Sequence, residues 1–545
     1  MMQNPKWTAL YKKNPERVIF CLIFIMAAIY YGWRLFALTP WYDELYTYYY
    51  FVSRGPIYAA IHWPLPNNHV GYSVLSAFLD FFGSPAIGLR GISYISSLLS
   101  LWLLYWIGEN CFSKGVALLP PCLFASMSLI NLLAVQGRGY ALSACLYLSA
   151  FCCLWKIIVV KDKKFRYYIL FGTALVWSLY TLASNVYFVL PLCASGGIVL
   201  LCQKRFREFW KLVGVSLCSA ACTVGLYGVI WLAVGSNLLG KTEGGAYFGM
   251  GHVQIILHAP FTAAKTGIDY MLGMPYIQSV AREGYLLRLG SYIRTLFGLY
   301  YNGLAYVLMG IVLIGLAASV WRLVSWYRKC RSDQVQEKEQ DANFMEWYLL
   351  ISFLMTPVML IIQSALPYYR VFSYFGVAIA LMCTWFVSLC IEMAVHKFGR
   401  NSKRISGMIS LIVYLFFVKT LFFPLEDTPY GSRETAVEEA YRTVNISDYE
   451  RIAVADCDQE YLLKYLYGLD IENDNGVRLT RTIEDADCVL LDRDLLLPEE
   501  QFIMKDSAGD EWKFYVTKDT LPVEYLEEHM QAVYENARFV FYVKR

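Results

Sequence analysis

The sequence predicts an all-α integral membrane protein, a bundle of about eleven transmembrane helices followed by a small α/β domain. Three observations support this fold class. Of the 545 residues, 57% are hydrophobic and only 17% are charged, whereas a soluble domain carries about a quarter charged residues. Long apolar runs recur along the first 424 residues. The acidic residues concentrate at the end, where 28 of the 44 lie after Leu425, against 13 of the 47 Lys and Arg.

The apolar runs define the bundle, because roughly 17–25 apolar residues cross a bilayer as a helix. The first run follows a basic lead, as a signal peptide would. It is long, however, has no small-residue cleavage site and is followed by many similar runs, so we interpret it as a transmembrane helix. The predicted spans are 18–38, 86–107, 115–134, 140–158, 168–184, 186–202, 212–234, 301–321, 347–365, 371–394 and 406–424.

Basic and non-basic connectors alternate between these spans. Lys and Arg concentrate in cytoplasmic loops, so the alternation predicts a multi-pass protein with a cytoplasmic N-terminus, and we expect it in the plasma membrane of a bacterium. The outer loops 39–85 and 235–300 then face the extracytoplasmic side. The expected domains are a transmembrane domain, residues 1–424, and a soluble extracytoplasmic domain, residues 425–545. The basic connectors are 1–17, 161–166, 203–211, 322–346 and 396–404.

The acidic tail predicts a small α/β domain. RIAVADC and ADCVLLD are typical of buried strands and DQEYLLKYLYG of a helix, while LPVEYLEEHMQAVY and ARFVFYVKR predict a helix–strand pair. No glycine-rich phosphate loop is present, which favours a lid or recognition domain over a nucleotide site. The 15 cysteines form no CxxC pair with metal-like spacing. Basic residues occur in short blocks between apolar runs, which argues against a nucleic-acid partner.

Two adjacent acids follow the first span in WYDELYTYYY, residues 41–50. On a helix, Asp43 and Glu44 point about a hundred degrees apart and cannot form a face-to-face pair. Either Asp43 acts as a general base on a hydroxyl from a partly dry site, or both acids only cap the helix. Leu45, Tyr48, Tyr49 and Val52 recur at helical spacing, and we expect this stripe to lie along the membrane interface.

Polar clusters occur in two further predicted outer turns. HWPLPNNH, residues 62–69, is either a sugar-binding turn that uses His62, Asn68 and His69, or an ordinary interfacial turn. Its two histidines come without a third local metal ligand. In SLYTLASNVYF, the polar residues Thr181, Ser184 and Asn185 either line a cavity or cap two helices at a turn.

Two arginines occupy tight turns on the predicted outer side, where topology needs no positive charge. These are Arg138 in VQGRGYAL and Arg370 in LPYYRVF. The planar guanidinium binds two phosphate oxygens at once, although a single such arginine is explained as well by lipid headgroups. Two arginines, with acids on the same side, favour a phosphate-bearing ligand.

Taken in order, these stretches resemble the GT-C membrane glycosyltransferases, and in particular the protein O-mannosyltransferase and aminoarabinose transferase superfamily. The sequence departs from that pattern at Val70 and Gly71, where prolines usually follow the histidine, and at Gln136, where relatives usually carry glutamate. The resembling stretches, over residues 40–390, are YDELY, NNHVGYSVLSAFLDFFG, LRGISYISSLLS, AVQGRGYALSACLYLS, LYTLASNVYFVL and PYYRVFSYFGVAIALM.

The resemblance implies a GT-C-type bundle with a cavity open to the membrane lipid and to the extracytoplasmic space. It implies a polyprenyl-phosphate sugar as donor and a protein, lipid or polysaccharide as acceptor. Asp43 would deprotonate the acceptor hydroxyl, Glu44 would shape that site, and Arg138 and Arg370 would hold the phosphate. The expected substrate-binding residues are His62, Asn68, His69, Tyr140, Asn185 and Tyr369.

The implied chemistry is a direct displacement with inversion. A lipid phosphate is a good leaving group, so two arginines can stabilise its developing charge without a protonating acid. No cofactor is then required, although Glu44 with a histidine could hold a divalent metal. The main alternative is a transporter or flippase of lipid-linked sugars, which predicts charged residues deep within helices or paired broken helices. A silent scaffold whose tail binds a partner is a third reading.

Overall fold

The structure is a computed structural model, in which the chain divides into two compact units. The helical unit consists of Met1–Phe36 and Arg54–Leu425, and the tail unit of Ala37–Ser53 and Glu426–Arg545. The short segment after the first span therefore groups with the end of the chain. The residues described are 15–61, 68–112, 115–162, 164–234, 257, 284–331, 343–364, 366–398, 415, 432–471, 478–497 and 514–545.

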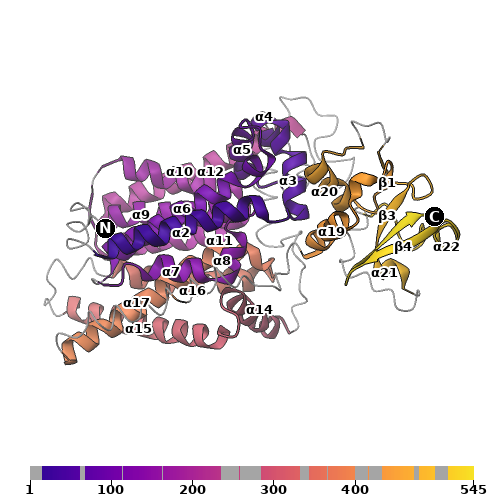
Figure 1. Cartoon of the computed structure of the whole chain (residues 1–545). Coiled ribbons are helices and arrows are strands. Elements are labelled where there is room, and N and C mark those ends of the chain that lie inside the picture. Colours follow the sequence, from indigo (N-terminus) through magenta and orange to yellow (C-terminus); the bar gives the residue numbers. More distant parts are fainter. Residues whose placement is uncertain are drawn as a thin grey trace, which may run out of the picture. The chain divides into compact units, whose positions relative to one another are not determined.

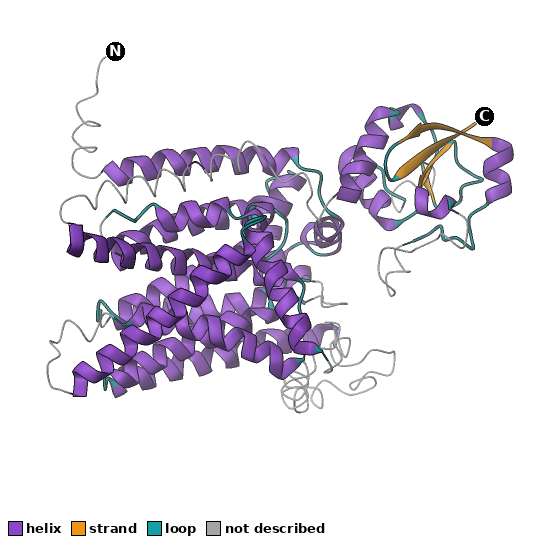
Figure 2. Ribbon diagram, turned by 90° about the horizontal axis from the view of Figure 1, so that it is seen from below, coloured by secondary structure: helices purple, strands orange, loops and turns teal. Residues whose placement is uncertain are grey.

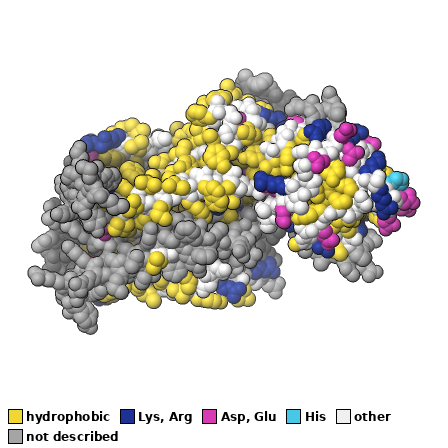
Figure 3. All heavy atoms as spheres, in the orientation of Figure 1, with side chains coloured by type: hydrophobic (Ala, Val, Ile, Leu, Met, Phe, Trp, Pro, Cys, Tyr) yellow, Lys and Arg dark blue, Asp and Glu magenta, His cyan; other side chains and the backbone are white. Residues whose placement is uncertain are grey.

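The protein is an integral membrane protein. Among the described residues, eight helices are long and apolar enough to cross a bilayer, and the long helices run alongside one another (Figure 1). Hydrophobic side chains cover much of the visible surface of this unit (Figure 3), as lipid contact requires. The eight correspond to α2 (Pro15–Ala37), α6 (Pro85–Cys111), α9 (Tyr140–Ile158), α11 (Val186–Cys202) with its preceding turn η2 (Ala183–Asn185), α12 (Phe206–Val234), α15 (Ala305–Arg331), α16 (Phe344–Gln363), and η5 (Tyr369–Tyr374) with α17 (Phe375–Phe398).

The remaining three predicted spans differ from these eight. Residues 168–184 correspond to α10 (Arg166–Thr181), which has only 16 residues. Residues 406–424 lie outside the described part of the chain, apart from Leu415. The prediction of one continuous helix over 115–134 is wrong, because the chain forms α7 (Leu119–Ser126) and α8 (Ser128–Leu133).

The break between α7 and α8 has a local cause at the carbonyl of Leu123. In a continuous helix, this oxygen would accept from the amide of Met127. It accepts instead from the hydroxyl of Tyr301, at 2.7 Å, and from Ser126 Oγ, at 3.0 Å. Met127 is extended, with φ −71° and ψ 128°. The side chain of Tyr301, which directly follows α14 (Tyr285–Tyr300), thus replaces the backbone bond that would have continued the span.

Short helices fill the connections that the sequence assigns to the outer side. Residues 39–85 contain α3 (Tyr42–Tyr50), η1 (Val52–Arg54), α4 (Pro56–Ile61) and α5 (Val70–Asp80). The end of the 235–300 loop forms α14 (Tyr285–Tyr300), and the glycine-rich start of that loop lies outside the described residues.

The tail unit is the α/β domain that its sequence predicts, and it holds the strands drawn in Figure 2. Its five-stranded sheet has the order β2-β1-β3-β5-β4, with β1 parallel to β2 and β3, and β5 antiparallel to β3 and β4. The strands are β1 (Ile452–Ala453), β2 (Leu479–Thr480), β3 (Cys488–Asp492), β4 (Met530–Glu535) and β5 (Phe539–Lys544). The helices are α19 (Ser432–Thr443), η6 (Ile446–Asp448), α20 (Cys457–Tyr467), α21 (Arg493–Leu496) and α22 (Val523–His529).

One helix predicted in the tail forms only in its first half, and its second half is a strand. The helix expected over LPVEYLEEHMQAVY ends at His529, and Met530–Glu535 form β4 instead. Asn536 explains the change of direction, since its side chain accepts from the amides of Arg538 and Phe539, at 3.0 and 2.8 Å. This turn returns β5 antiparallel to β4, and the backbone groups of 530–535 gain sheet partners.

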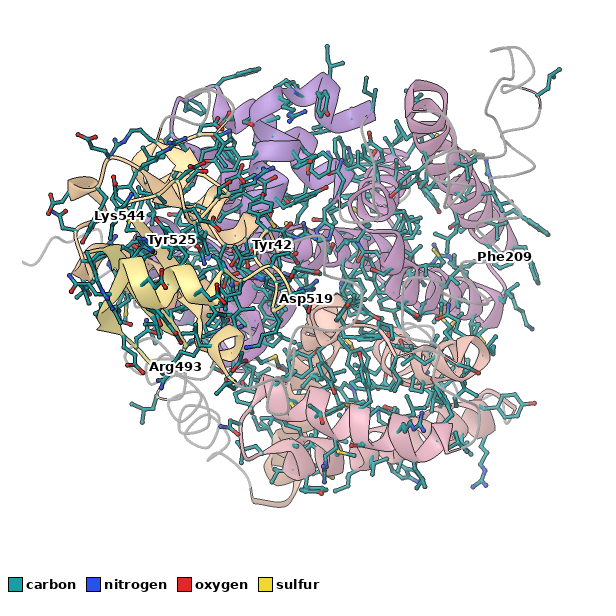
Figure 4. All side chains as sticks on the ribbon, turned by 90° about the vertical axis from the view of Figure 1, so that its right-hand side faces the viewer. Tyr42, Phe209, Arg493, Asp519, Tyr525 and Lys544 are labelled. Carbon is teal, nitrogen blue, oxygen red and sulfur yellow. The ribbon has the colours of Figure 1, made fainter. Side chains whose placement is uncertain are left out.

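The helix α3 belongs to the tail's hydrophobic core. Leu45 is fully buried there, in a cluster with residues of α19, α20 and the sheet, and Tyr49 packs against the same cluster. Tyr42, labelled in Figure 4, lies with its ring 6.3 Å from that of Tyr461, which also stacks on Tyr49 at 5.6 Å. The expectation that this stripe lies along the membrane interface is therefore wrong, because protein side chains cover it.

Candidate functional site

The turn that carries Arg138 is held by serines of α6. Ser97 Oγ donates to the carbonyl of Ala134 at 2.6 Å. Ser93 Oγ bonds to the carbonyls of Gln136 and Arg138, the latter at 3.2 Å. These two serines are one helical turn apart, so they face the same connection. They fix the backbone that presents the Arg138 side chain.

His69 and Arg138 lie in direct contact within the helical unit. Nε2 of His69 is 3.1 Å from Nη2 of Arg138, and the amide of Gly139 donates to His69 Nδ1 at 2.9 Å. Both side chains are buried, with His69 4% and Arg138 2% exposed. The ring of Tyr140 meets the imidazole edge-on, with centroids 5.2 Å apart. The predicted residues His69, Arg138 and Tyr140 therefore form one cluster.

Thr181 closes this cluster from the end of α10. A methyl group added at Gly71 would lie 2.6 Å from Thr181 Oγ1, and one added at Gly139 would lie 2.5 Å from Thr181 Cγ2. Neither separation is tolerated by real side chains, so both positions require glycine for close approach. Gly71 stands where the resembling family usually has proline, and here it lets α5 approach α10.

The side chain of Asn185 caps the end of α10 but makes no capping bond to α11, whose N-cap position it occupies, so the predicted role of capping two helices is confirmed for one helix. Its side-chain amide donates to the carbonyl of Ser178, at 2.7 Å, and to Ser143 Oγ, at 2.8 Å. Ser143 Oγ in turn donates to the carbonyl of Gly139. Asn185 thus connects the end of α10 to the start of α9, immediately behind the arginine turn.

Asn68 has a supporting position. Its side chain donates to the carbonyl of Ala59, at 3.1 Å, and accepts from Ser73 Oγ, at 2.7 Å. It thereby connects α4 to α5 and sets the turn that ends at His69. His62 lies outside the described residues.

The turn that carries Arg370 is held by α14. Tyr292 stacks on Tyr369, with ring centroids 4.6 Å apart, and its hydroxyl donates to the carbonyl of Pro367 at 2.5 Å. The guanidinium of Arg370 lies over the ring of Tyr368, 4.9 Å from its centroid. Tyr369 is therefore engaged with protein, and the half-buried Arg370 is presented on an ordered turn.

The two arginines act on the same imidazole. Burial, followed by the charges of Arg138 and Arg370, holds the pKa of His69 well below its usual range. An imidazolium next to two guanidinium groups would be a third positive charge in a buried place. His69 is therefore neutral at physiological pH, and the arginines give the site a positive potential suited to an anion.

The predicted acids lie in the tail unit. Glu44, 1% exposed, accepts from the amide of Trp41 at 3.0 Å and so caps α3. The half-buried Asp43 occupies the first turn of the same helix. Glu434 of α19 accepts from the amide of Tyr42 at 2.9 Å, and the Asp43 charge raises the pKa of Glu434 in addition to the larger effect of burial. The capping role is confirmed for Glu44, while the catalytic role of Asp43 stays a prediction.

No metal centre is evident in the part of the chain that the structure describes, where no group of three or more His, Cys, Asp or Glu side chains is placed to hold an ion. Both ring nitrogens of His69 lie within hydrogen-bond distance of N–H groups. Whether the protein requires a metal stays a prediction.

Sequence reasoning missed several residues that build the site. Ser93, Ser97 and Ser143 support it through the contacts above. The serines of α6 had a usable signal, since polar residues four apart on an apolar helix share one face. Thr181 was identified as a polar residue that breaks an apolar run, but its close approach to Gly71 and Gly139 could not be predicted, because it depends on two glycines in distant segments.

Comparison with known proteins places the fold. No protein-family model and no curated protein matches the chain. Among solved structures, it is similar to ArnT from Cupriavidus metallidurans bound to undecaprenyl phosphate, with a TM-score of 0.51 and 9% identity over 97% of this chain and 98% of that one. The chain has the GT-C fold. The resemblance stated from the sequence motifs is thus confirmed at the level of the fold.

Other GT-C structures are also similar. The oligosaccharyltransferase of Archaeoglobus fulgidus, solved with Zn and sulfate, has a TM-score of 0.45 and 14% identity over 84% of this chain. This chain spans 62% of that protein's length. The arabinosyltransferase EmbB from Mycobacterium smegmatis has a TM-score of 0.37 and 12% identity, over 94% of this chain and 45% of that one.

Proposed function

We propose that this protein transfers a sugar from a polyprenyl-phosphate carrier to an extracytoplasmic acceptor hydroxyl of a protein, lipid or polysaccharide. The observation that best supports this function is the buried contact between Arg138 and His69, whose pKa is lowered by burial and then by the charges of Arg138 and Arg370. Such a site favours a phosphate. The GT-C fold adds support, since the ArnT structure of the same fold holds undecaprenyl phosphate.

In the proposed reaction, the acceptor oxygen attacks the anomeric carbon while the bond from that carbon to the phosphate oxygen breaks. Arg138 and Arg370 bind the phosphate and stabilise the charge that develops on it. Asp43 takes the proton of the acceptor hydroxyl, a role that rests on its place after the first span and on the family resemblance. Attack opposite to the leaving group inverts the anomeric configuration. The reaction balances without a cofactor.

The test is an assay of the purified full-length protein with polyprenyl-phosphate sugars, which measures release of polyprenyl phosphate. Arg138→Gln should lower kcat/KM by roughly tenfold to hundredfold, because hydrogen bonds to charged groups contribute about 1.5–3 kcal/mol. The matched control is Arg54→Gln, since Arg54 is exposed and contacts Tyr58; its activity should stay within about twofold.

Two results would contradict the proposal. Undiminished transfer by Asp43→Asn would remove the base from the mechanism. Movement of a lipid-linked sugar across liposomes, with no transfer to any acceptor, would instead support the transporter alternative.

A further inference from the structure

The imidazole of His69 lies between two N–H donors. The Gly139 amide is 2.9 Å from Nδ1, and Nη2 of Arg138 is 3.1 Å from Nε2. A neutral imidazole carries one N–H and one acceptor nitrogen. It can therefore accept from Gly139 or from Arg138, but not from both.

The backbone decides which nitrogen accepts. The Gly139 amide is fixed at the start of α9, and a buried backbone amide requires an acceptor. The Arg138 guanidinium has five N–H groups and can direct them elsewhere. Nδ1 is therefore the acceptor, and the proton of the neutral ring is on Nε2. In this tautomer, Nε2–H and the guanidinium N–H of Arg138 face each other.

The N–H groups of His69 and Arg138 repel each other when nothing lies between them. They become favourable when both donate to one shared acceptor. An oxygen that carries negative charge can accept from both at once. The pair also lies at the N-terminus of α9, where the helix contributes partial positive charge. We propose that His69 is a second anion-binding donor, whose Nε2–H binds the same phosphate oxygen as Arg138.

This assignment gives His69 a defined part in ligand binding rather than a general place near a sugar. It rests on the proposed function only for the source of the phosphate, since the two donors would bind a lipid phosphate monoester or free phosphate by the same chemistry. Burial and the charges of Arg138 and Arg370 keep the pKa of His69 low, and a neutral ring can donate from Nε2 without adding a charge to the site.

Two substitutions separate the two nitrogens of His69. His69→Asn keeps an acceptor near the Nδ1 position, for the Gly139 amide, and removes the distal donor. His69→Gln keeps an amide donor near the Nε2 position and removes the proximal acceptor. Binding of undecaprenyl phosphate and of inorganic phosphate is measured on the purified full-length protein, with undecaprenol as the uncharged control. Affinity for both phosphates should fall roughly tenfold in His69→Asn and stay within about threefold in His69→Gln.

The opposite order, or equal losses in both variants, would overturn the assignment, because His69 would then act only by holding the turn. Nitrogen-15 spectra of histidine-labelled protein give a second readout. The signal lost in His69→Asn should show a protonated Nε2 and an unprotonated Nδ1, and an Nδ1–H tautomer would also overturn it. Phosphate binding with the expected order, in a protein that transfers no sugar, would leave this assignment standing while the proposed function fails. If the protein transfers sugar but its affinity for phosphate does not depend on His69, the proposed function stands and this assignment fails.

Discussion

The carboxylate of Glu434 accepts a hydrogen bond from the backbone amide of Tyr42, 392 residues earlier in the chain, at 2.9 Å. Glu434 is 4% exposed, so this bond is protected from water. It holds the first turn of α3 against α19, next to the residue predicted to be the base. Thr39 makes a second bond between the same segments, to Glu438. The tail unit therefore fixes the conformation of the segment that contains Asp43.

Replacing Glu434 with Ala should loosen α3. The Tyr42 amide would lose its buried acceptor, at a cost of about 1–3 kcal/mol in the free energy of unfolding of the tail unit. Hydrogen exchange of peptides covering 41–50 should rise in the same variant. The matched control is Glu439→Ala in the same helix, whose exposed side chain should change stability by less than about 0.5 kcal/mol. Unchanged exchange in Glu434→Ala would show that the bond does not hold α3.

The charge of Glu434 predicts a pH dependence with a definite sign. Burial raises the pKa of Glu434 above its ordinary value of 4.5. The folded state therefore binds this proton more tightly than the unfolded state, and the contribution of Glu434 to stability falls as the pH rises from 4.5 through the raised pKa. Glu434→Gln keeps an acceptor for the Tyr42 amide and removes the charge. Its stability relative to the natural protein should therefore improve between pH 4.5 and neutrality, as measured by thermal unfolding, and a constant difference would contradict the raised pKa.

Leu45 lies far from the acidic tail in the sequence, but the packing of α3 predicts that this leucine stabilises the tail unit. Leu45 is fully buried in the tail's core, and truncation of a buried leucine costs about 2–5 kcal/mol. Leu45→Ala should therefore lower the unfolding temperature of the tail unit. Val533, on β4, is 48% exposed, so Val533→Ala serves as the control with a small expected effect. Equal effects of the two substitutions would argue against the placement of α3 in this core.

The sequence predicts best what depends on local composition. Long apolar runs identify eight helices capable of spanning a membrane, because length and hydropathy suffice for that prediction. The break between α7 and α8 was not predictable, since it depends on Tyr301, 178 residues away from the carbonyl that it contacts. The strand β4 was missed for a similar reason, as its pairing with β5 outweighs local helix propensity.

The same distinction applies to the site. Charge in a turn predicted to be on the outer side identifies Arg138, and the polar turn before α5 identifies His69. Their contact depends on the fold, because the two residues are 69 positions apart in the sequence. The neutral state of the imidazole depends on burial and on the charges of Arg138 and Arg370. The placement of Leu45 in the tail was likewise hidden, because an amphipathic stripe does not reveal whether lipid or protein covers it.

The close approach of Gly139 to Thr181 predicts a rescue experiment. Gly139→Ala would place its methyl group 2.5 Å from Thr181 Cγ2, and such overpacking costs about 1–3 kcal/mol. Thr181→Ser removes Cγ2, so the double variant should recover most of the lost thermal stability. Gly71→Ala is the control, because its nearest neighbour is Thr181 Oγ1, at 2.6 Å, which serine retains. Thr181→Ser should therefore rescue Gly139→Ala but not Gly71→Ala. Failure to rescue Gly139→Ala would show that the Thr181 methyl group does not set the spacing of α9 and α10 around His69.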